Sequence, residues 1–133
     1  MLGLDILYYT KADLSDAANF PKVQTFRGLE SFSVRENYAD PTSFFFFSQA
    51  GQAFHYHGHN DCGAFAFEMD DVRWAIDLGK DDYGLNQTGK YYLVYRKRTE
   101  GHNTLTINNN DGWNQKEDEY AALIRCEEGD GGA

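Results

Sequence analysis

The stretch Thr42-Ser43-Phe44-Phe45-Phe46-Phe47-Ser48-Gln49 contains four consecutive phenylalanines. A run that is apolar at every position fits a strand buried on both faces. It does not fit an amphipathic helix, whose apolar residues recur at every third or fourth position. Asp40-Pro41 marks a turn just before it. We therefore expect the central core strand of the fold at Thr42–Gln49.

Short alternating segments lie on both sides of this strand. Before it, Val23–Phe26 and Phe32–Arg35 alternate apolar with polar residues across a glycine-containing turn, the pattern of an antiparallel hairpin. Further strands are expected at Ala64–Glu68, Val72–Leu78, Tyr91–Arg96, Asn103–Asn108 and Tyr120–Cys126. Many short strands in a chain with 16% aromatic residues predict an all-β fold, specifically a two-layer antiparallel β-sandwich.

The 133 residues are enough for one domain with one hydrophobic core. We expect a lead-in segment over residues 1–21, the sandwich over 22–126, and a disordered tail over 127–133, because that tail is acidic, rich in glycine and has almost nothing to bury. No apolar run of about 18 residues predicts a membrane span, and Met1–Tyr9 does not have the features of a signal peptide. Cys62 and Cys126 are too few for a disulfide framework, and we expect two free thiols.

The net charge of −9 argues against nonspecific binding of nucleic acids, which depends on lysine and arginine neutralising phosphates. The same charge repels acidic polysaccharides, so binding of a uronate needs a local basic patch. Arg96-Lys97-Arg98 is the one dense basic run. We predict that Arg96 and Arg98 bind the carboxylate of such a substrate and that Lys97 faces away. The alternative is a solvated charged surface.

Three of the four histidines lie in His55-Tyr56-His57-Gly58-His59-Asn60-Asp61. If this stretch is extended, its alternate side chains, including Asp61, share one face. A single histidine is more often a surface or core residue than a ligand. Clustering on one face favours a role in metal binding.

Two distant residues follow the same rule of alternation. In the predicted strand Val72–Leu78, Asp77 is placed opposite to Trp74 and Ile76, which we expect in the core. His102 is placed opposite to the apolar residues of its own strand, Leu105 and Ile107. Three segments can thus deliver His59, Asp77 and His102 to one site. Two imidazoles and a carboxylate suit Zn²⁺ with an open fourth position, and they also suit non-haem Fe(II).

These motifs, in this order, resemble the C-terminal β-sandwich of heparinase II/III-like proteins, whose relatives include alginate and oligoalginate lyases. The resemblance covers about Phe26 to Ile107. It is carried by His57-Gly58-His59-Asn60-Asp61-Cys62-Gly63-Ala64-Phe65, Trp74-Ala75-Ile76-Asp77-Leu78-Gly79, Tyr83, and His102-Asn103-Thr104-Leu105. It implies a supersandwich-like fold.

The resemblance also implies a chemistry. Zinc is expected on His59, Asp77 and His102. His57 is expected to face the substrate cleft, together with a loop tyrosine, Tyr83, Tyr91 or Tyr92, of which the spacing favours Tyr91. The implied reaction is β-elimination from a uronic acid, in which a base removes the C5 proton and an acid protonates the leaving glycosidic oxygen.

In this family the principal catalytic residues lie in an N-terminal α/α-toroid, whereas this chain has no extended helical periodicity. We therefore expect the chain to be part of a larger protein, to need that helical domain as its partner, and to be inactive alone. The expected substrate is an acidic polysaccharide such as a heparin-type chain or alginate. The expected location of a bacterial parent protein is periplasmic or secreted.

Two other functions are open. One is a carbohydrate-binding or structural β-sandwich without catalysis. The other is an Fe(II)-dependent oxygenase, whose facial triad would use His59, Asp61 and His102 and leave Asp77 idle. The oxygenase fits poorly, because the interval before the second histidine is short and the next arginine is Arg125.

Overall fold

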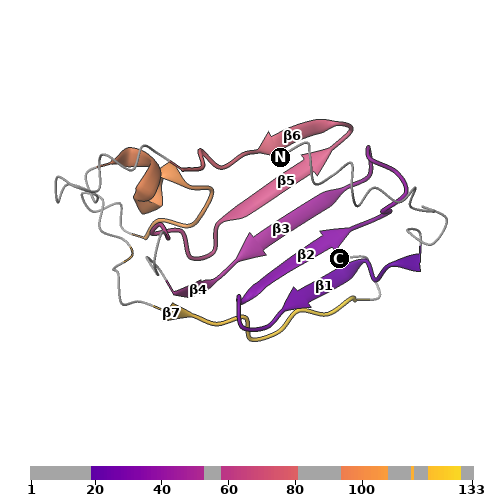
Figure 1. The fold of residues 1–133 in the computed structure, drawn as a ribbon, viewed down its shortest axis with the longest axis horizontal. Coiled ribbons are helices and arrows are strands. Elements are labelled where there is room, and N and C mark those ends of the chain that lie inside the picture. The colour runs from indigo at the N-terminus through magenta and orange to yellow at the C-terminus, as the bar shows by residue number, and fades with distance from the viewer. Residues whose placement is uncertain (1–18, 53–57, 81–93, 108–114, 116–119, 130–133) are drawn as a thin grey trace, which may run out of the picture.

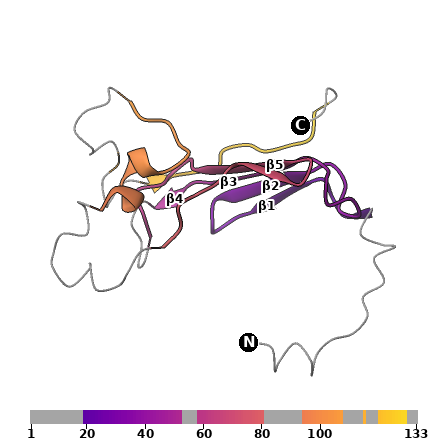
Figure 2. The ribbon, with the colours of Figure 1, turned by 90° about the horizontal axis from the view of Figure 1, so that it is seen from above.

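The computed structural model describes residues 19–52, 58–80, 94–107, 115 and 120–129. Within them the chain forms one antiparallel sheet of five strands in the order β1-β2-β3-β5-β6 (Figure 1). The strands are β1 (Val23–Phe26), β2 (Ser31–Arg35), β3 (Phe45–Gln49), β5 (Phe65–Met69) and β6 (Val72–Ala75). The predicted all-β fold is confirmed, and its described part is this open sheet, seen edge-on in Figure 2.

The phenylalanine run and the hairpin lie where the sequence places them. Strand β3 occupies the middle of the sheet, between β2 and β5. Strands β1 and β2 pair in register from Val23 opposite Val34 to Phe26 opposite Ser31. The turn between them contains Gly28 at a φ of 89°, which glycine adopts more readily than other residues. The central strand and the first hairpin are therefore confirmed.

Aromatic rings cover one face of the sheet around β3. Phe46 stacks on Phe65 with ring centroids 5.7 Å apart and contacts Phe32 at 5.9 Å. On the opposite face the guanidinium of Arg35 lies 4.8 Å from the ring centroid of Phe45. The phenylalanines of β3 thus point to both faces, as expected, and all five residues of the strand are half-buried.

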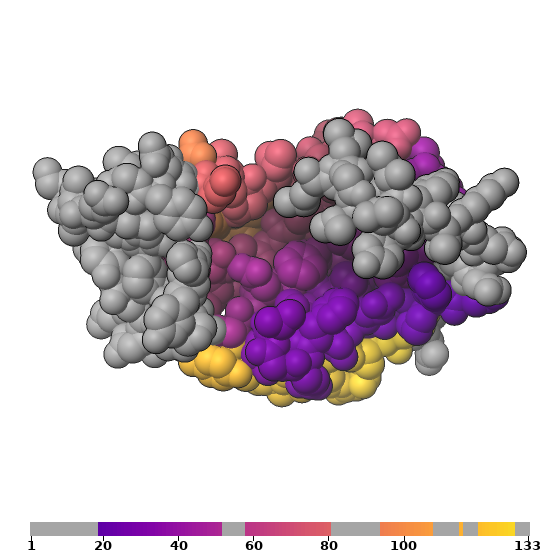
Figure 3. Space-filling view, viewed as in Figure 1, coloured from indigo at the N-terminus to yellow at the C-terminus, as the bar shows by residue number. Residues whose placement is uncertain are grey.

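Few apolar residues of the described part are buried. Val34 and Ala64 are buried, whereas a series of large apolar side chains is exposed: Phe26, Leu29, Phe65, Met69, Val72, Trp74, Ile76, Leu78, Leu105, Ile107, Tyr120 and Ile124. Figure 3 shows one side of this sheet, with atoms of β3 visible near its centre. Exposed apolar surface on this scale is typical of a face that meets another part of a protein.

The prediction for Val72–Leu78 was wrong in part, because β6 ends at Ala75 and contains a bulge. Arg73 pairs with Glu68 and Ala75 pairs with Phe67, so one extra residue, Trp74, interrupts the alternation. Phe67 and Glu68 are adjacent in β5 and point to opposite faces of the sheet, so their partners in β6 also point to opposite faces. Arg73 and Ala75 therefore do not share a face, and Trp74 is 65% exposed instead of buried in the core.

Two later predicted strands do not form where the structure describes them; residues 91–93 and 108 lie outside the described residues. The end of Tyr91–Arg96 forms a 3-10 helix, η4 (Tyr95–Lys97), which is followed by η5 (Thr99–Gly101). No strand forms over residues 103–107, where Asn103 hydrogen-bonds to two other segments in place of a strand ladder. Leu105 and Ile107 are exposed and do not anchor a core.

A short second sheet lies beside one end of the first (Figure 1). Its strands, β4 (Gly51–Gln52) and β7 (Tyr120–Ala121), pair antiparallel. The strand predicted at Tyr120–Cys126 therefore forms only over its first two residues. Cys62 and Cys126 are not joined by a disulfide, and the thiol of Cys62 donates to the carbonyl of Gly51 at 3.2 Å. No helix in the described residues is long and apolar enough to cross a membrane.

Candidate metal centre

Three segments meet beyond the ends of β3 and β6, and each contributes a potential ligand. A ligand atom of His59, one of Asp61 and one of His102 all lie within 4.8 Å of one another. The rings of His59 and His102 have centroids 5.1 Å apart. Residues that are up to 43 positions apart thus converge on a region small enough to hold one metal ion.

His102 is the most enclosed member of this group. Its side chain has no exposed surface, and its Nδ1 lies 2.5 Å from Oδ2 of Asp77. Its other ring nitrogen, Nε2, is buried without a hydrogen-bond partner. Buried polar atoms normally have partners, because leaving one unsatisfied costs about 1–3 kcal/mol. The imidazole is therefore held at Nδ1 and lacks a partner at Nε2.

Asp77 is fixed through both carboxylate oxygens. Oδ1 accepts a hydrogen bond from the backbone N–H of Gly79 at 2.7 Å, and Oδ2 contacts His102. Partial burial acts to raise the pKa of Asp77, but the hydrogen bonds with His102 and Gly79 outweigh it, and the pKa is lowered. Asp77 is thus a carboxylate anion at neutral pH, the form that binds a metal cation.

Asp61 is held by a side chain that sequence reasoning missed. Its Oδ2 accepts a hydrogen bond from Nε2 of Gln49, the last residue of β3, at 2.7 Å. Burial raises the pKa of Asp61. Gln49, Asp61 and Asp77 also line one cavity of about 250 Å³. Gln49 gave no signal in the sequence, because a polar residue at the end of a strand is ordinary.

His59 has the protonation state that a metal ligand needs. Burial lowers its pKa, and the positive charges of His102, Lys97 and Arg96 lower it further, against an opposing effect of Asp77. The imidazole of His59 is therefore neutral at neutral pH. A neutral ring nitrogen can donate its lone pair to a metal without first releasing a proton.

Hydrogen bonds tie the three ligand segments together. The side-chain amide of Asn103 donates to the carbonyl of Phe65, at the start of β5, and to that of Ile76, which precedes Asp77. The hydroxyl of Thr104 donates to the carbonyl of Cys62 at 2.7 Å. Asn103 thus fixes the spacing between His102 and Asp77, a role that its place in the His-Asn motif could have suggested.

Two glycines allow these segments to approach closely. Gly63 has a φ of 79°, and a Cβ added to it would lie 3.2 Å from Oγ1 of Thr104. A Cβ on Gly101 would lie only 2.2 Å from the carbonyl oxygen of Tyr95. Glycine is needed at the first position for its backbone angle and at the second for space. Both positions adjoin the candidate ligands.

The chain matches the model of a known protein family. The model of the heparinase II/III-like C-terminal domain matches residues 33–133. The chain belongs to the heparinase II/III-like family. It is therefore a β-domain related to polysaccharide lyases, and the family resemblance read from the sequence is confirmed. No curated protein matches the chain.

For this heparinase II/III-like domain, the residues present fit a zinc ion. Two imidazoles and two carboxylates are nitrogen and oxygen donors of the kind that zinc binds in proteins. Of the predicted ligand set, His59 and His102 lie in the close group of three, and Asp77 contacts His102 from outside that group. Asp61 occupies the third place in the group.

The basic run is engaged with the protein itself. Nη1 of Arg96 donates to the carbonyls of Leu78 and Lys80, at 3.4 and 3.1 Å, and Arg98 forms an ion pair with Glu100. Lys97, the last residue of η4, is buried. Arg96 thus holds the segment that follows Asp77 through these hydrogen bonds. Binding of a substrate by Arg96 and Arg98 stays a prediction.

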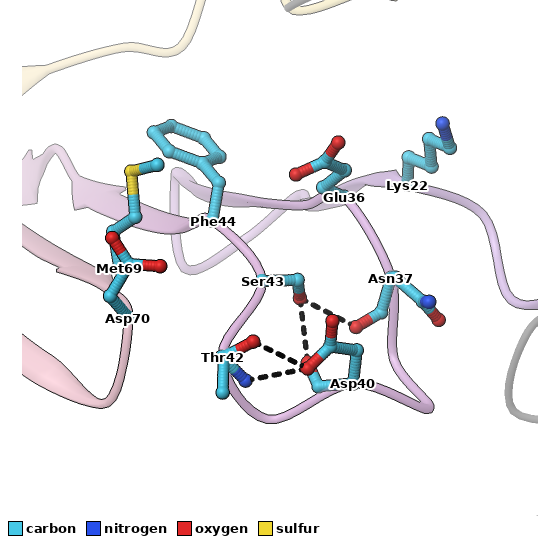
Figure 4. A pocket seen from close by; sticks show the side chains of 9 residues that line it. All are labelled: Lys22, Glu36, Asn37, Asp40, Thr42, Ser43, Phe44, Met69 and Asp70. Carbon is cyan, nitrogen blue, oxygen red and sulfur yellow. Dashed lines mark hydrogen bonds between the residues drawn. The ribbon is translucent and has the colours of Figure 1, made fainter.

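The predicted cleft residues His57, Tyr83 and Tyr91 lie outside the described residues. A separate open hollow of about 540 Å³ lies at the other end of the sheet (Figure 4). Lys22, Glu36, Asp40 and Asp70 are among its lining residues, and the Asp40 carboxylate is satisfied by the hydroxyl and backbone N–H of Thr42. Among the described residues, none of the predicted site residues lines this hollow.

Proposed function

We propose that this chain is the zinc-binding β-domain of a lyase that cleaves uronic-acid-containing polysaccharides, of the heparin type or alginate, by β-elimination. The observations that carry the proposal are that the rings of His59 and His102 lie 5.1 Å apart and that Nδ1 of His102 lies 2.5 Å from Oδ2 of Asp77. The family match supports it independently.

The proposed zinc ligands are His59, Asp77 and His102. Bound zinc would supply a positive charge next to the cleft and a cross-link between the three segments. The elimination itself needs only proton transfers and charge stabilisation. A base takes the C5 proton, the C4–O bond breaks as the C4=C5 double bond forms, and an acid protonates the leaving oxygen.

His57 and a loop tyrosine, Tyr91 or Tyr83, are the proposed contributors of this domain to the proton transfers. Arg96 and Arg98 are the proposed contacts of the uronate carboxylate, whose negative charge must be neutralised as the C5 carbanion develops. This requires that substrate compete with the internal partners of Arg96, the carbonyls of Leu78 and Lys80. A bidentate arginine–carboxylate pair is strong enough to do so.

The proposed partner of the domain is the helical α/α-toroid of its family. The exposure of apolar residues of and beyond β6, such as Trp74 at 65% and Ile76 at 59%, supports such a contact. On this proposal the active site lies between the two domains and the isolated chain is inactive. The proposed location of the parent protein is periplasmic or secreted.

A non-catalytic module is the second candidate. The cross-links at Asn103 and Thr104 already join the three ligand segments, so a metal there could serve stability alone. The oxygenase alternative shares its ligand set with the close group His59, Asp61 and His102, but it does not account for the family match.

Elemental analysis separates these candidates. The purified chain, grown with zinc and iron both supplied, is expected to contain about one zinc per chain. Stoichiometric iron in place of zinc would favour the oxygenase. Zinc in the wild-type chain, together with full lyase activity once the helical domain is added, would favour the lyase over a purely structural module.

A further inference from the structure

The four-residue turn that begins at Asp61 has backbone groups that need partners from elsewhere. The backbone N–H of Ala64 donates to the carbonyl of Asp61 at 2.8 Å and closes the turn, and Gly63, its third residue, has a φ of 79°. Neither the N–H nor the carbonyl of Cys62 takes part in that closing hydrogen bond. Because Cys62 is half-buried, both groups need partners from another segment.

The side-chain amide of Gln115 supplies both partners. Its Oε1 accepts a hydrogen bond from the backbone N–H of Cys62 at 2.8 Å, and its Nε2 donates to the carbonyl of Cys62 at 2.9 Å. Two residues of neighbouring antiparallel strands exchange the same pair of hydrogen bonds. One side chain thus takes the place of a strand residue beside the turn, from 53 positions away in the sequence.

Cys62 also joins the segments that carry the two histidines. It follows His59 by three positions. Its carbonyl oxygen, which can accept two hydrogen bonds, accepts a second one at 2.7 Å from the hydroxyl of Thr104, two positions after His102. Gln115 therefore holds the residue at which the His59 segment is bonded to the His102 segment.

We propose that Gln115 is a positioning residue of the zinc site, which clamps Cys62 against Thr104 and so sets the spacing between His59 and His102. This inference rests on the proposed zinc-binding function. Gln115 need not touch the metal, because outer residues that orient metal ligands are nearly as important for affinity as the ligands themselves. Two hydrogen bonds to one residue restrict both the position and the rotation of its backbone, which is what a preorganised site requires.

The test measures zinc affinity in the full 133-residue chain. Gln115→Ala removes both hydrogen bonds to Cys62, and we expect one zinc per chain to remain, with a dissociation constant raised about 10–100-fold. Gln24→Ala is the matched control. Gln24 is also half-buried, and its Nε2 donates to the hydroxyl of Tyr38 at 2.9 Å in another part of the sheet, so its loss is expected to leave the affinity unchanged.

Cobalt in place of zinc gives a spectroscopic readout, because the visible absorption of Co²⁺ depends on the arrangement of its ligands. We expect a changed spectrum in Gln115→Ala and the wild-type spectrum in Gln24→Ala. Gln115→Met keeps the length of the side chain without its hydrogen bonds, and it is expected to behave as Gln115→Ala does. This second variant preserves the test if the smaller alanine prevents folding.

The thiol of Cys62 reports on the clamp without any metal. It donates to the carbonyl of Gly51 at 3.2 Å, and a loosened turn would release it. In the zinc-free chain we expect Cys62 to react faster with a thiol reagent in Gln115→Ala than in the wild type. Cys126, the second thiol that is not in a disulfide, is the internal reference and is expected to keep its rate.

Two results would overturn the inference. The first is wild-type zinc affinity together with a wild-type cobalt spectrum in folded Gln115→Ala or Gln115→Met. The second is equal acceleration of Cys62 and Cys126, which would show that Gln115 supports the fold as a whole and not this turn. A wild-type chain that binds no zinc would contradict the proposed function itself, whereas a zinc-binding wild type with unaffected variants would contradict the positioning role alone.

Discussion

Asp77 and His102 are 25 positions apart in the sequence, yet Oδ2 of the first lies 2.5 Å from Nδ1 of the second. Neither residue is in a strand. Asp77 follows the end of β6, and His102 follows η5. Asn103 holds the two segments at this spacing through its bonds to Phe65 and Ile76. The contact is the closest link between residues that the family resemblance assigns to one metal.

Removing the carboxylate of Asp77 is expected to abolish zinc binding. Asp77→Asn retains an oxygen that can accept from Gly79, so the local turn should survive, but the amide is a poor zinc ligand. The wild-type chain should melt at a higher temperature with zinc than with a chelator, and the variant should show no such difference. Stabilisation of Asp77→Asn by zinc to the wild-type extent would remove Asp77 from the ligand set.

The lowered pKa of His59 gives the metal-free chain a specific pH dependence. The folded state keeps His59 neutral, whereas the unfolded state takes up a proton as the pH falls below the ordinary value of 6.5. Stability is therefore complete well above that value and is lost as the pH falls from it towards the lowered folded pKa. Urea unfolding with a chelator present, at about pH 7.5 and about pH 5.5, measures the effect.

The variant His59→Gln isolates this contribution, because glutamine does not titrate. We expect the wild-type chain to lose more stability than His59→Gln between the two pH values. Equal losses in the two proteins would show that the pKa of His59 is not lowered on folding.

Space at Gly101 is expected to control the shape of the metal site. Gly101→Ala would force a Cβ against the carbonyl oxygen of Tyr95, and this backbone atom cannot move without shifting η4 and the adjacent His102. We expect a loss of at least about 1–3 kcal/mol of stability together with weaker zinc binding. Denaturant melts and zinc titrations measure both.

Gly28→Ala is the matched control for this substitution. Gly28 lies in the first hairpin at a φ of 89°, and nothing stands within 4 Å of its added Cβ. Its replacement should cost about 1–2 kcal/mol through the backbone angle and leave zinc affinity unchanged. If Gly101→Ala binds zinc as tightly as Gly28→Ala does, the close approach of Gly101 to Tyr95 does not shape the site.

The isolated chain is expected to show no lyase activity. Elimination from a uronate creates an unsaturated product that absorbs ultraviolet light, and we predict no rise in absorbance with heparin-type chains or with alginate. The reason is the proposed division of the active site between this domain and a helical one. A clear rise with the 133-residue chain, abolished by His57→Ala, would disprove the need for a second domain.

The sequence predicted the first half of the sheet better than the second. Local signals decide the hairpin and β3, because a glycine turn and a continuous run of phenylalanines each leave few alternatives. After Ala64 the register depends on long-range contacts. The position of Asp77 was predicted from regular alternation along this strand, and the bulge at Trp74 reverses that alternation. No residue type in the strand predicts the bulge.

Of the predicted ligands, His59 and His102 belong to the close group in the structure, whereas its third member is Asp61 and not Asp77. Strand alternation and family motifs both indicated His59 and His102, and these residues do lie together. Asp61, the third member of the group, accepts a hydrogen bond from Gln49, which lies 12 positions earlier at the end of β3. Such side-chain bridges between distant segments have no sequence period and become visible only in the folded chain.

The most direct test of the central claim is the metal content of three purified proteins: the wild-type chain, His102→Gln and the control Asp71→Asn. If His59, Asp77 and His102 form a zinc site, the wild type and the control will each contain about one zinc per chain, and folded His102→Gln will contain none. Zinc retained by His102→Gln, iron in place of zinc, or a wild-type chain without metal after growth in zinc would contradict the account.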